Sequence, residues 1–512
     1  MAQTTYRANL SAKVFPFISE YFGRSVIIPG PDQNFSRQLA SSEDLDKDRG
    51  IPQLYYCHNV MPAAEGFQSV GYRTRITDTK SGFASIFTLR DTFGNEVFFS
   101  HTSEGKNYIL PYGGLSWREI NSAGAASDVT VASVNGQSFI CFSTLGCYVY
   151  NAASNSLLPV ALSGLDSTKV LGITSSAGYL IAWTDSAIAW SSTVEHTAPT
   201  DPFDFVPSLA TGAGGGKVEA ARGKITLCVA HYLGFIIYTT DNAIASVYSG
   251  NARYPFNLRE IVASGGLADA SRISYDSGTG NHYAYTTSGM QLVSITQTQT
   301  VFPEVTDFLA GGYFEDFDET TRTFVTQVLT GPLKKAVNAV SDRYLVISYG
   351  ISELTHALVF DLVMKRFGKL RVTHTSCFEW KQIGPEVIET PRSSIGFLSV
   401  NGSIKTVDFG YAASNSYGVM LLGKYQLSRS RTVQLQEVSL ENVRIGNTFS
   451  LYNSNTLDGK TLQPFVPGYL AESSGTYRKY NFHQTGINHT LLFIGGFYCD
   501  SLVLKLNVHG RR

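Results

Sequence analysis

The chain has 512 residues and a net charge of −1, and 16% of its residues are charged, against about 25% in an average domain. This length allows about three domains and a large core, although all-β folds often extend this far as one unit. Because the net charge is close to zero, no overall positive field draws the molecule to nucleic acid or to an anionic membrane. Any contact with DNA must therefore be local or geometric.

Glycine and aromatic residues are abundant, with 47 Gly, 28 Tyr and 31 Phe, which favours a β-rich protein with much surface meeting other protein. The N-terminus lacks the apolar core of a signal peptide, and no run approaches the 18 or so apolar residues of a membrane span. We therefore expect a soluble protein made in the cytosol. Six scattered cysteines argue against a disulfide framework and predict buried thiols, with Cys141 and Cys147 facing each other across a hairpin.

Residues 1–58 show little alternation and are broken at Pro29, Gly30 and Pro31, so they are expected to form an extended arm rather than a domain. Within this arm, Asp44, Asp46 and Asp48 are spaced as in a calcium loop. Their glycine is one residue late for an EF-hand, and Tyr55 stands where the bidentate Glu belongs. A solvated acidic turn is the better interpretation.

Residues 59–410 contain a series of seven predicted β-hairpins, each with turn residues between two apolar runs. Their turns are Gly94-Asn95, Leu145-Gly146, Asp185-Ser186, Asp241-Asn242, Ser288-Gly289, a turn near Ser352, and Asn401-Gly402. From position 95 to position 402 the six intervals average about 51 residues, which is close to the repeat of four-stranded propeller blades. The pattern predicts an all-β propeller, with seven blades if each hairpin marks one blade.

Two regions depart from this pattern. The segment 313–342 mixes a charged turn with a possible short helix after Pro332. Residues 411–512 contain alternating strands, one with a bulge between Leu435 and Val438 and a clean one through Leu502 to Val508. These C-terminal strands are expected either to close the propeller ring or to form a small added sandwich.

The stretch from Tyr179 to Gly216 joins one of the hairpins to a long Pro/Gly-rich connection. Trp183 and Trp190, one in each arm, are expected in the blade core rather than in a ligand site. The connection is too long for a simple blade turn. The sequence therefore predicts that 197–216 projects from the ring toward a neighbouring subunit or the channel.

Motifs for known chemistry are incomplete. The five glycines of 212–223 invite a phosphate-loop interpretation, but Thr211 replaces the first Walker glycine and Val218 replaces the Ser or Thr that holds magnesium. There is no HExxH and no GxSxG. Catalytic, cofactor-binding and metal-binding residues are therefore all expected to be absent, and the chain is not expected to be an enzyme.

Three weaker features also suggest sites. Glu315, Asp316, Asp318 and Glu319 could supply a glycosidase pair, although adjacent acids in one loop are usually a solvated face. The stretch SNTLDGKTL at 454–462 loosely resembles a sialidase Asp-box, with its glycine one residue early. The basic residues could meet DNA phosphates or an acidic partner; they are Arg429, Arg431, Arg511 and Arg512.

Several segments in order resemble the tail nozzle proteins of short-tailed bacteriophages, also called tail tubular protein B or packaged-DNA stabilisation proteins. They are PFISEYFGRSVIIPGPDQNF, DRGIPQLYYCHNVMPAAEGFQSVGY, the connection from Trp190 through Pro207 to the glycines, GKYQLSRSRTVQLQEV and LVLKLNVHGRR. The resemblance runs from about residue 16 to the end. It is carried by the order of the segments, since no single motif is specific.

The resemblance implies a virion protein, assembled in the host bacterial cytoplasm, that forms a hexameric ring of propellers below the tail adaptor, and it implies about six blades in each propeller, where the hairpins allow seven. The ring would continue the DNA channel without sequence-specific binding and would carry fibres or spikes, with no membrane contact and no cofactor. The arm is expected to pack on a neighbour or on the adaptor, so that its deletion leaves folded monomers. The alternatives are a carbohydrate-binding or glycosidase-type propeller and a cellular adaptor propeller without a ring.

Overall fold

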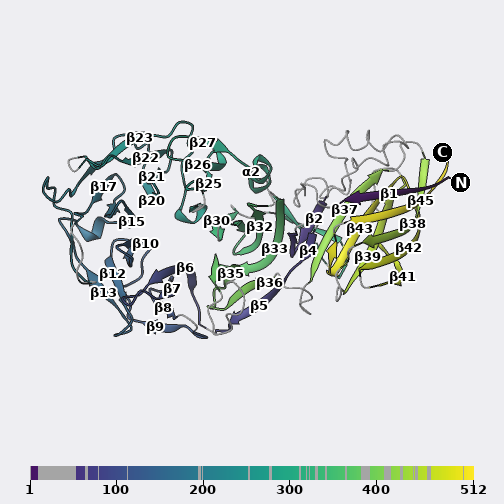
Figure 1. Ribbon diagram of the computed structural model, residues 1–512, viewed down its shortest axis with the longest axis horizontal. Coiled ribbons are helices and arrows are strands. Elements are labelled where there is room, and N and C mark those ends of the chain that lie inside the picture. The colour runs from purple at the N-terminus through teal and green to yellow at the C-terminus, as the bar shows by residue number, and fades with distance from the viewer. Residues whose placement is uncertain are drawn as a thin grey trace.

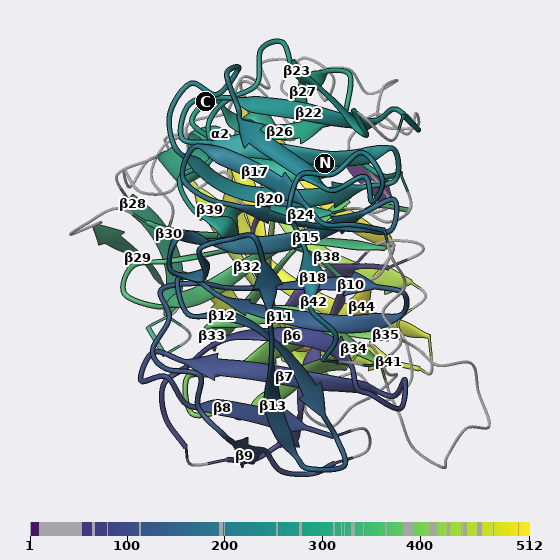
Figure 2. The ribbon, with the colours of Figure 1, turned by 90° about the vertical axis from the view of Figure 1, so that its left-hand side faces the viewer.

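A computed structural model describes residues 2–9 and 54–511, except for short gaps of which the longest are 382–392, 409–416 and 458–462. The described residues form a seven-bladed β-propeller and, beside it, a β-sandwich that contains both ends of the described chain (Figure 1). Seen from the side opposite the sandwich, the propeller lies in front of it (Figure 2). The predicted propeller class is therefore confirmed, and the blade count is the seven that the hairpins allowed, not the six that the resemblance implies.

Each blade is a four-stranded antiparallel sheet whose strands follow the chain, from the inside of the ring to its rim. Blade 1 comprises β6 (Phe83–Arg90), β7 (Glu96–Thr102), β8 (Asn107–Leu110) and β9 (Arg118–Ile120). Blade 2 comprises β10 (Val129–Val134), β11 (Gln137–Phe142), β12 (Gly146–Asn151) and β13 (Ser156–Val160). Blade 3 comprises β15 (Gly172–Ser176), β16 (Tyr179–Trp183), β17 (Ala187–Trp190) and β19 (Gly214–Lys217).

Blade 4 comprises β20 (Ile225–His231), β21 (Gly234–Thr239), β22 (Ala243–Tyr248) and β23 (Phe256–Glu260). Blade 5 comprises β24 (Ile273–Tyr275), β25 (His282–Thr286), β26 (Gly289–Val293) and β27 (Thr298–Thr300). Blade 6 comprises β30 (Lys334–Val340), β31 (Tyr344–Gly350), β32 (Leu354–Asp361) and β33 (Arg366–His374). Blade 7 comprises β34 (Ser376–Lys381), β35 (Ser393–Leu398), β36 (Ile404–Asp408) and β5 (Gly71–Ile76).

The ring is closed by β5, which precedes blade 1 in the chain and pairs antiparallel with β36 as the outer strand of blade 7. The C-terminal strands do not close the ring. Each of the seven predicted hairpins falls in a different blade, and turns such as that at Gly402 have the positive φ (82°) that favours glycine. The first hairpin joins the first and second strands of its blade, whereas the other six join the second and third. This difference in phase is one reason why the sequence intervals are uneven.

Seven separate hydrophobic clusters hold the propeller together, one between each pair of neighbouring blades. The seventh cluster joins blade 7 to blade 1, with Phe378 and Leu398 packing beside Phe83 and Trp117. Trp117 also donates a hydrogen bond from Nε1 to the carbonyl of Gly402 at 2.7 Å. Closure therefore rests on burial between blades as well as on the pairing of β5.

Short elements lie outside the four strands of each blade. β14 (Leu162–Ser163) pairs in parallel with β18 (Phe203–Asp204). The helix α2 (Pro303–Ala310) follows blade 5, and the hairpin of β28 (Tyr313–Asp318) and β29 (Thr323–Val328) follows the helix. The prediction of a short helix after Pro332 is wrong, because Lys334–Val340 is β30, the inner strand of blade 6. Val337 of β30, and Leu333 just before it, are buried in the same cluster as Leu345 and Ile347 of β31.

The sandwich consists of two five-stranded sheets. One has the order β1 (Ala2–Asn9), β45 (Ser501–Arg511), β38 (Arg431–Glu441), β42 (Tyr477–Gly486) and β41 (Tyr469–Ser473). The other has the order β2 (Leu54–His58), β37 (Gly418–Gln426), β43 (Asn488–Gly496), β39 (Thr448–Thr456) and β40 (Val466–Pro467). The ends of segment 1–58 thus supply strands to the same domain as residues 418–511.

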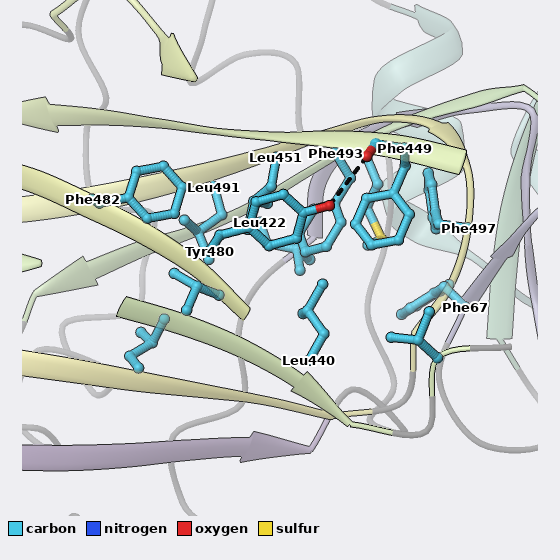
Figure 3. Packing of buried hydrophobic residues seen from close by; sticks show 14 of the residues in the cluster. Phe67, Leu422, Leu440, Phe449, Leu451, Tyr480, Phe482, Leu491, Phe493 and Phe497 are labelled. Atoms are coloured by element: carbon cyan, nitrogen blue, oxygen red, sulfur yellow. Dashed lines mark hydrogen bonds between the residues drawn. The ribbon is translucent and has the colours of Figure 1, made fainter. Parts of the chain in front are cut away.

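The two sheets bury an aromatic and aliphatic core between them (Figure 3). Phe449, Leu451 and Phe493 come from one sheet, and Tyr480 and Phe482 from the other. The hydroxyl of buried Tyr480 donates a hydrogen bond to the Phe449 carbonyl at 3.1 Å, so this polar group has a partner inside the core. The predicted bulge in β38 is present, since the register shifts between Leu435 and Glu437.

Candidate functional site: the joint between propeller and sandwich

A continuous sheet joins the two domains. Blade 6 extends from β33 through β3 (Val60–Pro62) and β4 (Phe67–Ser69) to β44 (Tyr498–Cys499), which precedes the last strand of the sandwich. Val60 pairs with Lys369 of β33, and Phe67 pairs with Cys499. Backbone hydrogen bonds therefore run without interruption from the propeller into the sandwich, and the joint is not a flexible linker.

A cluster of charged and polar side chains lies beside this sheet and connects three separate parts of the chain. Asp316 of the β28–β29 hairpin is 5% exposed and accepts a hydrogen bond from the Tyr56 hydroxyl of β2 at 3.0 Å. Its other oxygen lies 3.1 Å from Arg371 of β33 and 3.6 Å from Nε2 of His356 on β32. Lys369, which is buried, places its ammonium 4.5 Å from the centre of the Tyr56 ring.

The electrostatics of the cluster keep its acid ionised and its imidazole neutral. Burial alone would raise the pKa of Asp316, but the contact with the His356 ring and the positive charges of Lys369 and Arg371 outweigh burial and lower the pKa. Burial lowers the pKa of His356 to about 4, and Asp316 opposes this only in part. At neutral pH the Asp316 carboxylate therefore faces two cations, Lys369 and Arg371, and the neutral imidazole of His356 lies beside it.

The hairpin that carries Asp316 also packs on the outer face of the sandwich. Phe317 is buried against Tyr56, Val419 and Leu492, which belong to the sheet that contains β2, β37 and β43. The centres of the Tyr56 and Phe317 rings are 6.3 Å apart. An insertion of the propeller thus covers apolar surface of the sandwich, and the Asp316 hydrogen bonds fix its position.

Two observations concern the chemistry that is open to this cluster. The nearest thiol, Cys57, is fully buried, and burial raises its pKa to about 12, so the nucleophilic thiolate is not formed. In the described part of the chain no group of three or more His, Cys, Asp or Glu side chains is placed to hold a metal ion. We interpret the cluster as a structural joint, in which a buried acid is compensated by cations from the other elements.

The structure corrects the interpretation of the acidic segment. Asp316 is not part of a solvated face, because the hairpin places its side chain in the joint between the two domains. Asp318 is solvent-accessible and accepts the backbone amides of Thr320 and Thr321, which is a turn role. The side chains of Glu315 and Glu319 lie outside the described residues. The sequence did hold a signal that this segment is packed. Two apolar residues, Phe317 and Phe324, stand at paired positions of the hairpin, and a solvated turn has no need of apolar cross-strand pairs.

Two parts of the connection 197–216, residues 203–205 and 214–216, pack on the ring, contrary to the prediction that the connection projects, whereas the turn between them is exposed at Val206 and Leu209. Phe203 and Phe205 are buried between blades 2 and 3, where the Phe203 ring lies edge-on to Phe139 at 4.9 Å. The segment then ends as β19, the outer strand of blade 3. An added Cβ on Gly215 would lie 2.6 Å from the Ile188 carbonyl oxygen, so the glycines let this strand approach closely.

The two tryptophans lie in blade 3. Trp183 is buried in the cluster between blades 3 and 4. Trp190 is half-buried and donates from Nε1 to the Gly212 carbonyl at 3.0 Å, which ties the connection to the blade. Gly216 and Lys217 belong to strand β19 rather than to a loop before a helix, so the glycine run is not a phosphate loop.

The remaining sequence candidates are placed as follows. Cys57, Cys141, Cys147, Cys228 and Cys377 are buried free thiols, and Cys141 is the cross-strand partner of Cys147. Arg431 and Arg511 are brought together as partners on β38 and β45. The acidic turn at 44–48, residues 458–462 of the Asp-box stretch, Arg429 and Arg512 lie outside the described residues.

No family model and no curated protein matches this chain. Among solved structures, it is similar to BamB from Moraxella catarrhalis at 8% identity, covering 70% of this chain and all of that one with a TM-score of 0.33. It is similar to U3-55K at 10% identity, covering 66% and 98% with a TM-score of 0.42. A computationally designed protein, Ika8, matches at 10% identity, covering 65% and 99% with a TM-score of 0.35. No described helix is long and apolar enough to cross a membrane.

Proposed function

We propose that this protein is a structural subunit of the tail nozzle of a short-tailed bacteriophage. In this role six copies form a ring below the tail adaptor, continue the DNA channel, retain the packaged DNA and conduct it during ejection. Fibres or spikes dock on the ring. The proposal begins from the ordered series of segments, from residue 16 to the C-terminus, that resemble nozzle proteins.

The observation that carries the proposal furthest is the domain joint. A nozzle subunit must hold its parts in fixed relation while DNA under pressure passes. Here a seven-stranded sheet crosses from blade 6 into the sandwich, and the buried carboxylate of Asp316 connects β2, β32 and β33 through polar contacts. Such a joint suits a rigid virion component better than an enzyme that opens and closes around a substrate.

The low charge supports the same role. With a net charge of −1, the chain has no excess of cations to bind DNA strongly along a channel. Each phosphate contact would add affinity and slow the passage of DNA, so a conduit needs few of them. We propose a lumen without dense Lys and Arg, and a ring structure with a continuous basic lumen would contradict this.

Electron microscopy of the purified chain mixed with its candidate adaptor tests the role. The expected result is a six-fold ring bound to the adaptor. In parallel, phage particles assembled without this chain are expected to lose their packaged DNA. Particles that lack the chain yet retain and eject DNA normally would overturn the proposal. A glycan-binding screen and glycosidase assays of the same preparation address the carbohydrate-propeller alternative, for which we expect no signal.

A further inference from the structure

Cys141 and Cys147 stand opposite each other on the second and third strands of blade 2, β11 and β12. Both are free thiols, 0% and 2% exposed, in the cluster between blades 2 and 3. The other cysteines at described strand pairings face a different residue type; Cys57, Cys228, Cys377 and Cys499 pair with Met420, Ile237, Phe397 and Phe67. Among the strand pairings that the structure describes, two cysteines therefore meet only in blade 2.

The backbone hydrogen bonds around the two cysteines show which kind of cross-strand pair they form. Along an antiparallel strand, successive residues direct their amide and carbonyl groups to opposite neighbouring strands. The amide of Ser143 donates to the Asp128 carbonyl at 3.0 Å, on the side of β10, whereas the Phe142 carbonyl accepts the Leu145 amide at 2.9 Å, on the side of β12. Cys141 lies two residues before Ser143, so its backbone groups also point to β10 and away from Cys147.

Cys141 and Cys147 are thus a non-hydrogen-bonded pair of the ladder between β11 and β12. In such a pair the two Cα atoms are about 4.5 Å apart, and the side chains are closer than in a hydrogen-bonded pair. A disulfide requires a distance of about 4.4–6.8 Å between its Cα atoms, so the backbone can accept a bridge without rearrangement. Ser133 and Ser138 are a pair of the same kind between β10 and β11, and their hydroxyl oxygens are 3.2 Å apart.

The two thiols are close enough to affect each other's ionisation. Burial raises the pKa of Cys141 to about 12 and that of Cys147 well above its usual value, and the neighbouring Cys141 raises the pKa of Cys147 further. In the closed blade both side chains are therefore unreactive thiols. Reaction requires local opening of the hairpin, whose turn 143–145 exposes Leu145 by 37%.

We propose that Cys141 and Cys147 form a cross-strand disulfide when the protein meets hydrogen peroxide. One thiol loses its proton and its sulfur attacks a peroxide oxygen; the O–O bond breaks, and the hydroxide that leaves takes up the proton as water, which gives a sulfenic acid. The second thiol attacks that sulfur; the S–S bond forms, the S–O bond breaks, and a second water is released. Two thiols and one peroxide give one disulfide and two waters, and the peroxide accepts both electrons.

The bridge would hold closed a hairpin that contacts both neighbouring blade connections. The Ser143 amide bonds to Asp128 between blades 1 and 2, and the Thr144 amide donates at 2.8 Å to the carbonyl of Val170 between blades 2 and 3. A covalent link across β11 and β12 restricts opening of this turn and so keeps both contacts formed. A reducing thiol pool returns the pair to two thiols. The change occurs within one chain and does not depend on a ring.

The first test is peptide mapping of the folded, full-length chain after incubation with hydrogen peroxide, with remaining thiols then alkylated in denaturant. Trypsin releases residues 119–169 as one peptide that contains both cysteines. This peptide should be lighter by about 2 Da, the mass of two hydrogens, and should take up no alkyl group unless a reductant is added first. A peptide that still takes up two alkyl groups, or that gains oxygen on each sulfur, would overturn the proposal.

Alanine variants serve as controls for the mapping. Cys141→Ala and Cys147→Ala should each abolish the lighter species, whereas Cys228→Ala, at a buried cysteine of blade 4 whose cross-strand partner is Ile237, should retain it. Circular dichroism checks that each variant is folded. A lighter species that persists in Cys141→Ala would mean that another residue supplies the second sulfur, which would also overturn the proposal.

The second test measures the effect of the bridge by hydrogen exchange of the oxidised and the reduced wild-type chain. Amides of β11 and β12 should exchange about tenfold or more slowly in the oxidised chain, because local opening is restricted. Amides of β21 and β22 in blade 4 should exchange alike in both, and added reductant should reverse the difference. Equal exchange of β11 and β12 in the two forms would refute the proposed restriction of blade 2.

Discussion

Tyr56 and Asp316 are 260 residues apart in the chain, yet the hydroxyl of the first donates to the carboxylate of the second at 3.0 Å inside the joint between the two domains. One residue belongs to the second strand of the sandwich and the other to an insertion of the propeller. The contact therefore forms only when the two domains are docked.

Asp316→Asn should destabilise the chain by about 3 kcal/mol, because the buried ammonium of Lys369 and the half-exposed guanidinium of Arg371 then lack the anion that compensates them. Urea unfolding followed by tyrosine and tryptophan fluorescence measures the change. Glu219→Gln is the matched control, since its pair with Lys217 at 3.4 Å is exposed on both sides and contributes little. Equal stability of the two variants would mean that the joint does not depend on the carboxylate.

Stability should fall as the pH is lowered from 7.5 to 5.5. Burial lowers the pKa of His282 to about 3 and those of His356, His374 and His489 to about 4, below the value of about 6.5 expected in the unfolded chain. The unfolded state then binds more protons, so each histidine removes roughly 1.4 kcal/mol at pH 5.5. Denaturant titrations at several pH values test this, and a free energy of unfolding that is flat across the range would disagree with it.

Two neighbouring glycines of β19 should respond differently to alanine. A Cβ on Gly215 would lie 2.6 Å from the backbone oxygen of Ile188, which cannot move aside, whereas nothing lies within 4 Å of a Cβ on Gly216. Gly215→Ala should therefore cost about 1–3 kcal/mol, and Gly216→Ala should change stability by less than about 0.5 kcal/mol. Thermal unfolding of the two variants provides the comparison. If they behave alike, the segment does not form the outer strand of blade 3.

Deletion of residues 1–58 should not leave a folded monomer, which differs from the outcome predicted for a separate arm. The deletion removes β2, whose Tyr56 and Cys57 are buried in the two hydrophobic clusters on either side of its sheet. Near-ultraviolet circular dichroism and binding of a hydrophobic dye measure the effect. Removal of residues 2–9 alone takes one edge strand and should be milder. A native spectrum for the longer deletion would contradict the sandwich described here.

Much of the propeller follows from the sequence, because a hairpin is a local structure. The turns at Gly94, Asp185 and Gly402 each join strands fewer than ten residues apart, so turn chemistry and apolar alternation place them without any knowledge of the rest of the chain. The seven-fold repetition of that local signal was enough to predict the architecture. The bulge in β38 was predictable for the same reason, because the change in alternation between Leu435 and Val438 is local.

The closure of the ring, the composition of the sandwich and the joint were decided only by tertiary structure. β5 pairs with β36 more than 300 residues later, and β1 pairs with β45 at the other end of the chain. Such pairings depend on which sheet edges and apolar faces remain to be covered once the blades have formed. The acidic run at Asp316 and the Pro/Gly-rich connection after Trp190 looked like solvated or projecting loops because their local polarity is high. Their position was set instead by distant partners, the cations of β33 and the space between blades 2 and 3, and these have no signature in the local sequence.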